Sequence, residues 1–89
     1  MDKTIILDCR EMKTVRGTHR YLAGQLGFPG YYGGNLDALY DCLCELPSGT
    51  LIAFEHSGAL RWNLGDYGKR LMKTFEDASN AGFLKIETV

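Results

Sequence analysis

The segment Thr50–Glu55, with the sequence T-L-I-A-F-E, places the strongest constraint on the fold of this chain. Four consecutive apolar residues, preceded by a Pro-Ser-Gly turn, are typical of a strand that is buried on both faces. Such strands occupy the centre of parallel sheets, and their neighbours are joined to them by helical crossovers. The segment therefore predicts an α/β fold in which this strand lies in the middle of the sheet.

The rest of the chain fits such a fold. The predicted elements besides the central strand are strands over Lys3–Asp8 and Phe83–Thr88 and helices over Thr14–Gly27, 35–46 and Asp66–Ala81. A short piece with Trp62 and Leu64 precedes the last helix. Asn35 and Asp66 are expected as N-caps, and Gly82 as the stop of the last helix. This order predicts parallel strands, and 89 residues are enough for one small domain over 1–89.

Composition excludes several classes of function. The chain has 10 Lys and Arg against 11 Asp and Glu, so it lacks the basic excess of a protein that binds nucleic acid directly. No apolar run is long enough for a signal peptide or a membrane span. The cysteines Cys9, Cys42 and Cys44 are odd in number and lack the spacing of a zinc site or a disulfide framework. We therefore expect reduced thiols and a cytoplasmic protein without membrane contact.

The charges of the chain are unevenly distributed. No Lys or Arg occurs from Tyr21 to Leu60, and Asp37, Asp41 and Glu45 recur there at four-residue intervals. On the predicted helix they share one face, where each like-charged pair costs about 0.2–0.5 kcal/mol. Only Asp37, in the first turn, is favoured by the helix dipole. Two interpretations stay open: a solvated polar face, or a negative patch for a cationic partner or a metal ion.

Tyrosines near the acidic row favour a protein-binding surface. Tyr31 and Tyr32 precede the helix, and Tyr40 flanks the row. Aromatic residues are enriched at the centres of protein interfaces. One of the tyrosines should instead pack under the loop, and we expect this of Tyr32.

Catalytic arrangements are weak in this sequence. The only histidines are His19 and His56, and Glu55 and His56 are adjacent at a strand end, where side chains point to opposite faces. Cys42 falls on the apolar face of its helix, as a packing residue would. We predict no catalytic residue and no cofactor. A metal-dependent enzyme that uses Asp37, Asp41 and Glu55 stays open as an alternative.

The segment Phe28–Leu43, F-P-G-Y-Y-G-G-N-L-D-A-L-Y-D-C-L, resembles the barstar family of intracellular inhibitors of secreted guanyl-specific ribonucleases such as barnase. The family pattern is approximately L-P-x-Y-Y-G-x-N-L-D-A-L-W-D-C-L. A looser similarity extends over the whole chain, including His19 in the first helix and F-E-D-A-S-N-A-G in the last. The resemblance implies a three-stranded parallel sheet packed with three to four helices.

The resemblance also implies which residues contact the ribonuclease. Tyr31 corresponds to the tyrosine that covers the catalytic histidine of the enzyme, and Gly33 and Asn35 fall on loop positions that contact it. Asp37 and Asp41 match the two aspartates that meet the arginines and the lysine of the cationic active site. The implied inhibitor blocks that site by occupancy and does no chemistry itself.

Two of the implied contacts depart from the family pattern. Tyr40 stands where the family usually has tryptophan, and Asp77 stands where it has a glutamate that is one methylene longer. Small changes at an interface alter the choice of partner. An immunity protein or antitoxin of the same fold, directed against a different toxin, is therefore a further alternative.

Overall fold

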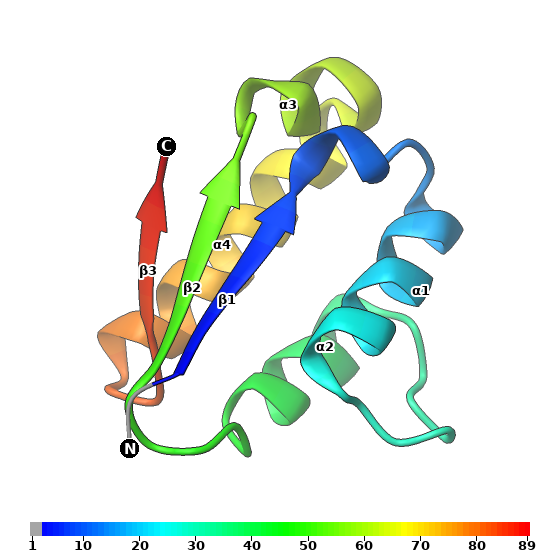
Figure 1. Ribbon diagram of the computed structural model, residues 1–89. Coiled ribbons are helices and arrows are strands. Elements are labelled where there is room, and N and C mark those ends of the chain that lie inside the picture. Colours follow the sequence, from blue (N-terminus) through cyan, green and yellow to red (C-terminus); the bar gives the residue numbers. More distant parts are fainter. Residues whose placement is uncertain (1–2) are drawn as a thin grey trace.

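Three parallel strands form the sheet in the computed structural model, which describes residues 3–89. They are β1 (Lys3–Asp8), β2 (Thr50–Glu55) and β3 (Lys85–Thr88), in the order β1-β2-β3 (Figure 1). Both pairings of β2 are parallel, and Ile52 lies opposite Ile5 on one side and opposite Ile86 on the other. The prediction of a parallel sheet with Thr50–Glu55 at its centre is confirmed.

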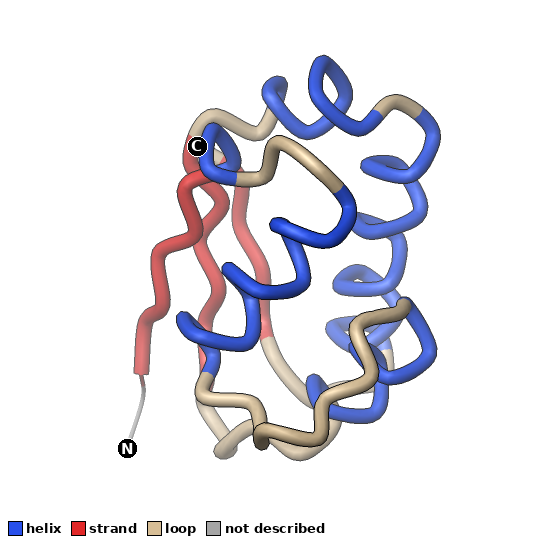
Figure 2. Tube along the Cα trace, turned by 90° about the vertical axis from the view of Figure 1, so that its right-hand side faces the viewer, coloured by secondary structure: helices blue, strands red, loops and turns tan. Residues whose placement is uncertain are grey.

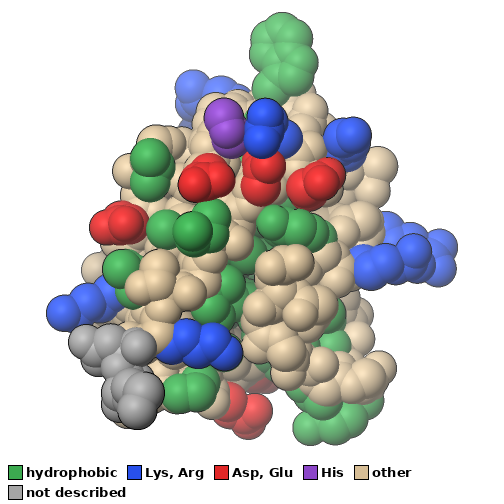
Figure 3. Space-filling model, viewed as in Figure 1, with side chains coloured by type: hydrophobic (Ala, Val, Ile, Leu, Met, Phe, Trp, Pro, Cys, Tyr) green, Lys and Arg blue, Asp and Glu red, His purple; other side chains and the backbone are tan. Residues whose placement is uncertain are grey.

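The helical elements are η1 (Cys9–Glu11, a 3₁₀ turn), α1 (Val15–Leu26), α2 (Leu36–Leu43), α3 (Gly58–Leu64) and α4 (Asp66–Asn80). Helices α1, α2 and α4 lie on one side of this sheet, and α3 lies beyond the carboxyl ends of the strands (Figures 1 and 2). No helix in the range 3–89 covers the other face of the sheet (Figures 1 and 3). Ile6 on β1 is 54% exposed. Parallel sheets are usually covered on both faces, so the chain departs from its class in this respect.

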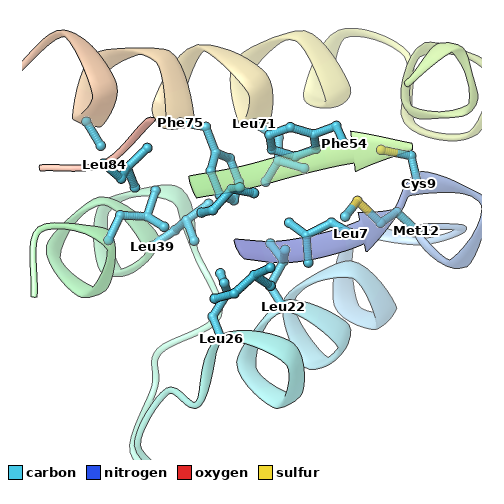
Figure 4. Close-up of a cluster of buried hydrophobic side chains, with 14 of the residues drawn as sticks. Leu7, Cys9, Met12, Leu22, Leu26, Leu39, Phe54, Leu71, Phe75 and Leu84 are labelled. Atoms are coloured by element: carbon cyan, nitrogen blue, oxygen red, sulfur yellow. The ribbon is translucent and has the colours of Figure 1, made fainter. Parts of the chain in front are cut away.

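The core lies between the covered face and the helices (Figure 4). Leu7 and Phe54 point inward from the strands and meet Leu22, Leu39 and Phe75 from three helices, all with no exposed surface. The rings of Phe54 and Phe75 pack edge to face with their centroids 4.9 Å apart. Both α2 and α4 are therefore anchored to the sheet through apolar faces, which leaves their polar faces outward.

The start of α4 differs from the prediction. Asp66 is the first helical residue and not its cap, because Gly65 occupies the N-cap position and provides no side-chain hydrogen bond. The tight connection after α3 explains this, since a Cβ at Gly68 would lie only 2.6 Å from the Leu60 carbonyl oxygen. Only glycine at position 68 permits that approach, and the chain turns at Gly65 to make it. Gly82 follows the helix as expected.

The sequence has no apolar run long enough for a membrane span, and the helices of the structure can be compared with that expectation. Among residues 3–89, no helix combines the length and the apolar character that crossing a bilayer requires.

Candidate functional site

The two adjacent tyrosines before α2 point in different directions. Tyr31 is 87% exposed, whereas Tyr32 is half-buried and packs against Phe28 with a centroid distance of 4.9 Å. The Tyr32 hydroxyl lies 2.6 Å from Nδ1 of His19. Tyr32 thus packs beneath the loop, as expected, and this anchoring presents Tyr31 to solvent.

A buried histidine connects this loop to two helices. His19 on α1 is 3% exposed, and its Nε2 lies 2.6 Å from the hydroxyl of Tyr67 on α4. Its two ring nitrogens thus bind Tyr32 and Tyr67, and one donates while the other accepts when the ring is neutral. Burial lowers the pKa of His19 and raises that of Tyr32. The His19 bridge fixes the loop, and sequence reasoning missed this role.

The loop enters α2 through Gly33, Gly34 and Asn35. Gly34 has a φ of 67°, a left-handed conformation that glycine adopts without strain, and it passes over the Cβ of His19. The Asn35 side chain accepts a hydrogen bond of 2.8 Å from the backbone N–H of Ala38, so the predicted N-cap is confirmed. All three loop residues are exposed at the entrance of the helix.

The outward face of α2 carries two exposed aspartates. Asp37 and Asp41 lie one turn apart, about 6 Å at Cα from the helical rise. Among residues 3–89, the side-chain ion pairs are Arg10 with Asp8 and Lys73 with Asp77. Neither aspartate of α2 therefore has an ion-pair partner within the described part of the chain.

Tyr40 connects the acidic face of α2 to α4. It is half-buried against the core. Burial, its neighbour Cys44 and then the nearby charges of Asp77 and Asp41 raise its pKa. Asp77 on α4 is exposed and binds Lys73. Tyr40 and Asp41 lie on α2 and Asp77 lies on α4, and these two helices pack against each other.

Glu45 does not extend the acidic row along the helix, and this part of the prediction is wrong. The helix ends at Leu43, and Glu45 donates its N–H to the Cys42 carbonyl in a tighter, 3₁₀-type turn. Pro47 disfavours helical backbone at Leu46 and lacks the N–H that would bind the Leu43 carbonyl, so the helix cannot continue through this point. Glu45 stays exposed nearby, on the turn and not on a helical face.

Several of the predicted residues surround one shallow hollow of about 190 Å³. Its wall includes Tyr31, Gly33, Asp41 and the displaced Glu45. A larger groove of about 830 Å³ lies between the same loop and α1, where Arg16 and Arg20 line it. The loop therefore separates an acidic surface from a basic one.

In the described part of the chain, the candidate metal ligands do not form a site and the thiols of Cys9 and Cys42 are not activated. Within residues 3–89, no three His, Cys, Asp or Glu side chains are placed to hold a metal ion, so Asp37, Asp41 and Glu55 form no such group. Burial raises the pKa of Cys9 to about 11. Burial, and then the charges of Glu45 and Asp41, raise the pKa of Cys42. Both shifts disfavour the thiolate that a nucleophile needs.

We use the name binding surface for the residues that the sequence predicts to contact a partner. They are Tyr31, Gly33, Asn35, Asp37, Tyr40, Asp41 and Asp77. The sequence prediction missed one pair at its edge, although the four-residue spacing of Lys73 and Asp77 on the last helix is a recognisable signal for such a contact.

Comparison with known proteins gives two findings. The protein family described as Barstar (barnase inhibitor) matches residues 3–85. A curated protein of Bacillus subtilis (strain 168), named "Putative ribonuclease inhibitor YrdF", is 36% identical in an alignment of 80 residues, and the alignment covers 85% of this chain and 85% of that protein. The family match extends over all the helices and includes every residue of the binding surface.

Proposed function

Because this chain belongs to the barstar family, we propose that it inhibits a secreted barnase-type ribonuclease by binding stoichiometrically to the active site. The observation that carries the proposal is the pair of exposed aspartates on α2, Asp37 and Asp41, which have no ion-pair partner among residues 3–89. They stand beside a loop that presents the exposed Tyr31.

The chemistry of the enzyme explains why carboxylates would inhibit it. A ribonuclease holds the phosphates of RNA with cationic side chains, and a carboxylate accepts the same charge-assisted hydrogen bonds as a phosphate oxygen. Two aspartates about 6 Å apart have nearly the spacing of successive phosphates. In this proposal Asp37 and Asp41 imitate the RNA backbone.

The surrounding residues would complete the interface. Tyr31 offers an exposed aromatic ring for the catalytic histidine, and Gly33 and Asn35 let the backbone of the loop approach the enzyme. Tyr40 and Asp77 extend the surface toward α4. The protein has a surface of 5500 Å², and a standard interface uses about 800 Å² of each partner, so this one face is large enough.

The steps of binding follow from the charges. Unpaired aspartates steer a cationic enzyme toward the surface and raise the association rate, most strongly at low salt. Once water is excluded, hydrogen-bonded charge pairs slow dissociation. The His19 bridge holds the loop in place in the free protein, so the loop loses little conformational entropy on binding.

A titration of RNA cleavage tests the proposal. Barnase is mixed with increasing amounts of this protein, and cleavage is expected to stop near one equivalent. A double variant, D37N/D41N, is the matched control, because it removes two charges and keeps the shape of the side chains. Absence of inhibition by the unmodified protein at micromolar concentration would exclude this class of partner.

One observation favours a second candidate, an immunity protein or antitoxin for a different toxin. The two departures from the family pattern, Tyr40 and Asp77, lie on α2 and α4, two helices that pack against each other. The two differences from the family pattern therefore fall in one region of the binding surface, where α2 meets α4. Affinity capture from the native host, with the captured toxin identified by its enzymatic activity, separates the two candidates.

A cytoplasmic location belongs to the same proposal. An inhibitor that protects a cell from its own secreted ribonuclease must act before the enzyme is exported. Cys9, Cys42 and Cys44 are all free thiols in the structure, which fits a reducing compartment. Fractionation of host cells with an antibody against this protein checks the location.

A further inference from the structure

The α4 side of the binding surface is basic where the α2 side is acidic. Helices α2 and α4 pack against each other, so their outward faces are neighbours. The exposed residues Lys69, Arg70 and Lys73 occupy the first two turns of α4, and Asp77 follows one turn later. A partner that covers α2 and reaches Asp77 therefore approaches a row of cations as well.

Two of these cations are held by contacts within the protein. The Arg70 guanidinium lies 5.3 Å from the ring centroid of Tyr67, whose hydroxyl belongs to the His19 bridge. The Lys73 ammonium donates a hydrogen bond of 3.3 Å to Oδ1 of Asp77. Lys69 forms no ion pair with another residue in the range 3–89.

The Lys73 contact changes what Asp77 can offer to a partner. Asp77 is exposed on α4, the helix that packs against α2, and it is one of the residues of the binding surface. Its charge is offset by Lys73 in the free protein. A cation of the partner that reaches Asp77 must displace the Lys73 ammonium and meets its repulsion.

We propose that Lys73 is a specificity-determining residue that neutralises Asp77 and confines cation recognition to α2. This inference rests on the proposed function. It identifies the partner as a ribonuclease whose cations face α2 and the loop, and it disfavours one whose cationic surface extends over α4. The ion pair in the free protein, and not the length of the Asp77 side chain, then limits the contribution of Asp77 to binding.

A double-mutant cycle tests this role. The variants K73M, D77N and K73M/D77N are compared with the unmodified protein, and association and dissociation of barnase are measured at low ionic strength. Methionine keeps the length and the apolar stem of lysine and removes its charge. K69M is the matched control, because it removes the same charge one turn earlier on the same helix.

We expect D77N to have different effects in the two backgrounds, and K73M to have a larger effect than K69M. Because Lys73 already offsets Asp77, D77N should weaken binding clearly less in the unmodified background, where it also leaves the Lys73 ammonium uncompensated, than in the K73M background, where the loss should exceed about 5-fold, as expected for coupled neighbours. K73M alone should raise the association rate by about 3-fold or more, and K69M by clearly less, since steering weakens with distance.

Equal effects of D77N in both backgrounds, or equal effects of K73M and K69M, would overturn the inference while leaving the proposed function intact. If the unmodified protein does not bind barnase at all, the proposed function fails first, and the inference fails with it. All three positions are exposed, and identical unfolding curves of the variants confirm that a change in affinity is not a change in folding.

Discussion

Helices α2 and α4 pack against each other, and their exposed aspartates Asp37, Asp41 and Asp77 differ in whether a lysine pairs with them. Asp37 and Asp41 on α2 face solvent without an ion-pair partner in the range 3–89, although like charges one turn apart oppose helix formation. Asp77 on α4 binds Lys73 one turn earlier. Asp77 is thus offset by a lysine of its own helix, whereas Asp37 and Asp41 are offset by no side chain in that range.

The inner faces of the same helices do not differ in this way. Leu39 and Leu43 on α2 and Leu71 and Phe75 on α4 have no exposed surface. Both helices are thus held by apolar packing, and the contrast is confined to their outer faces. Substitutions on the inner face should affect folding, and substitutions on the outer face of α2 should affect binding.

The largest effect is expected from Leu39→Ala on the inner face of α2. Leu39 is fully buried in the core, and truncation of such a leucine costs about 2–5 kcal/mol through lost burial and the remaining cavity. Urea unfolding measures the loss. Asp41→Ala, two residues along the same helix, is the control and should change stability by less than about 0.5 kcal/mol. Similar losses in both variants would contradict the division between the faces.

The next effect concerns binding. Asp41→Ala should weaken the complex with barnase by more than about 2 kcal/mol, as expected for a charged residue at the centre of an interface. Asp41 lines the hollow beside Tyr31 and has no internal cation to compensate it among residues 3–89. Titration calorimetry of both proteins gives the difference. A loss below about 0.5 kcal/mol would show that the site is misassigned.

The His19 bridge, which joins α4 to the loop before α2, should make stability depend on pH. Burial lowers the pKa of His19 below its ordinary value of 6.5. The unfolded chain then takes up a proton that the folded protein resists, so this contribution is complete above about pH 7 and declines as pH falls below 6.5. The slope cannot exceed about 1.4 kcal/mol per pH unit for one proton.

Unfolding by urea at several pH values between 7.5 and 5.5 measures that slope. His19→Gln should remove most of it. If this variant does not fold, an NMR titration of the ring in the unmodified protein gives the same information. A ring that titrates at or above 6.5 would disprove the prediction.

Local sequence signals predicted the elements well. The apolar run of β2 and the N-cap at Asn35 depend on residues that are close in sequence, and both agree with the structure. The exposed positions of Asp37 and Asp41 follow from helical periodicity alone. The resemblance of Phe28–Leu43 to a known family added the assignment of roles, which spacing alone does not provide.

Features that depend on tertiary contacts were missed. The His19 bridge joins residues 13 and 48 positions apart, and no local pattern marks it. Asp66 fails as a cap because Gly68 must approach the backbone of α3, which only the packed structure reveals. Glu45 leaves the helical row where the chain tightens before Pro47. Helix α2 is therefore shorter than predicted, and Glu45 lies on the turn that follows it.

A smaller effect is expected from Asn35→Ala at the start of α2. The Asn35 side chain accepts the N–H of Ala38, and loss of an N-cap costs about 1 kcal/mol. Thermal unfolding measures this loss. Asn35→Ser keeps an acceptor and should restore most of the stability. Equal losses in the two variants would mean that the cap contributes nothing.

The smallest effect on stability is expected from a substitution of Asp77 on α4. Lys73 and Asp77 are 73% and 50% exposed, and exposed pairs at this spacing contribute about 0.3–0.5 kcal/mol at most. The order with lysine before the acid is the weaker one on a helix. Asp77→Asn should therefore cost less than about 0.5 kcal/mol in urea unfolding, and added salt should abolish the difference. A larger, salt-resistant loss would mean that the pair holds α4 in place. Asp77 would then have a structural role, and the contrast with α2 would concern folding as well as binding.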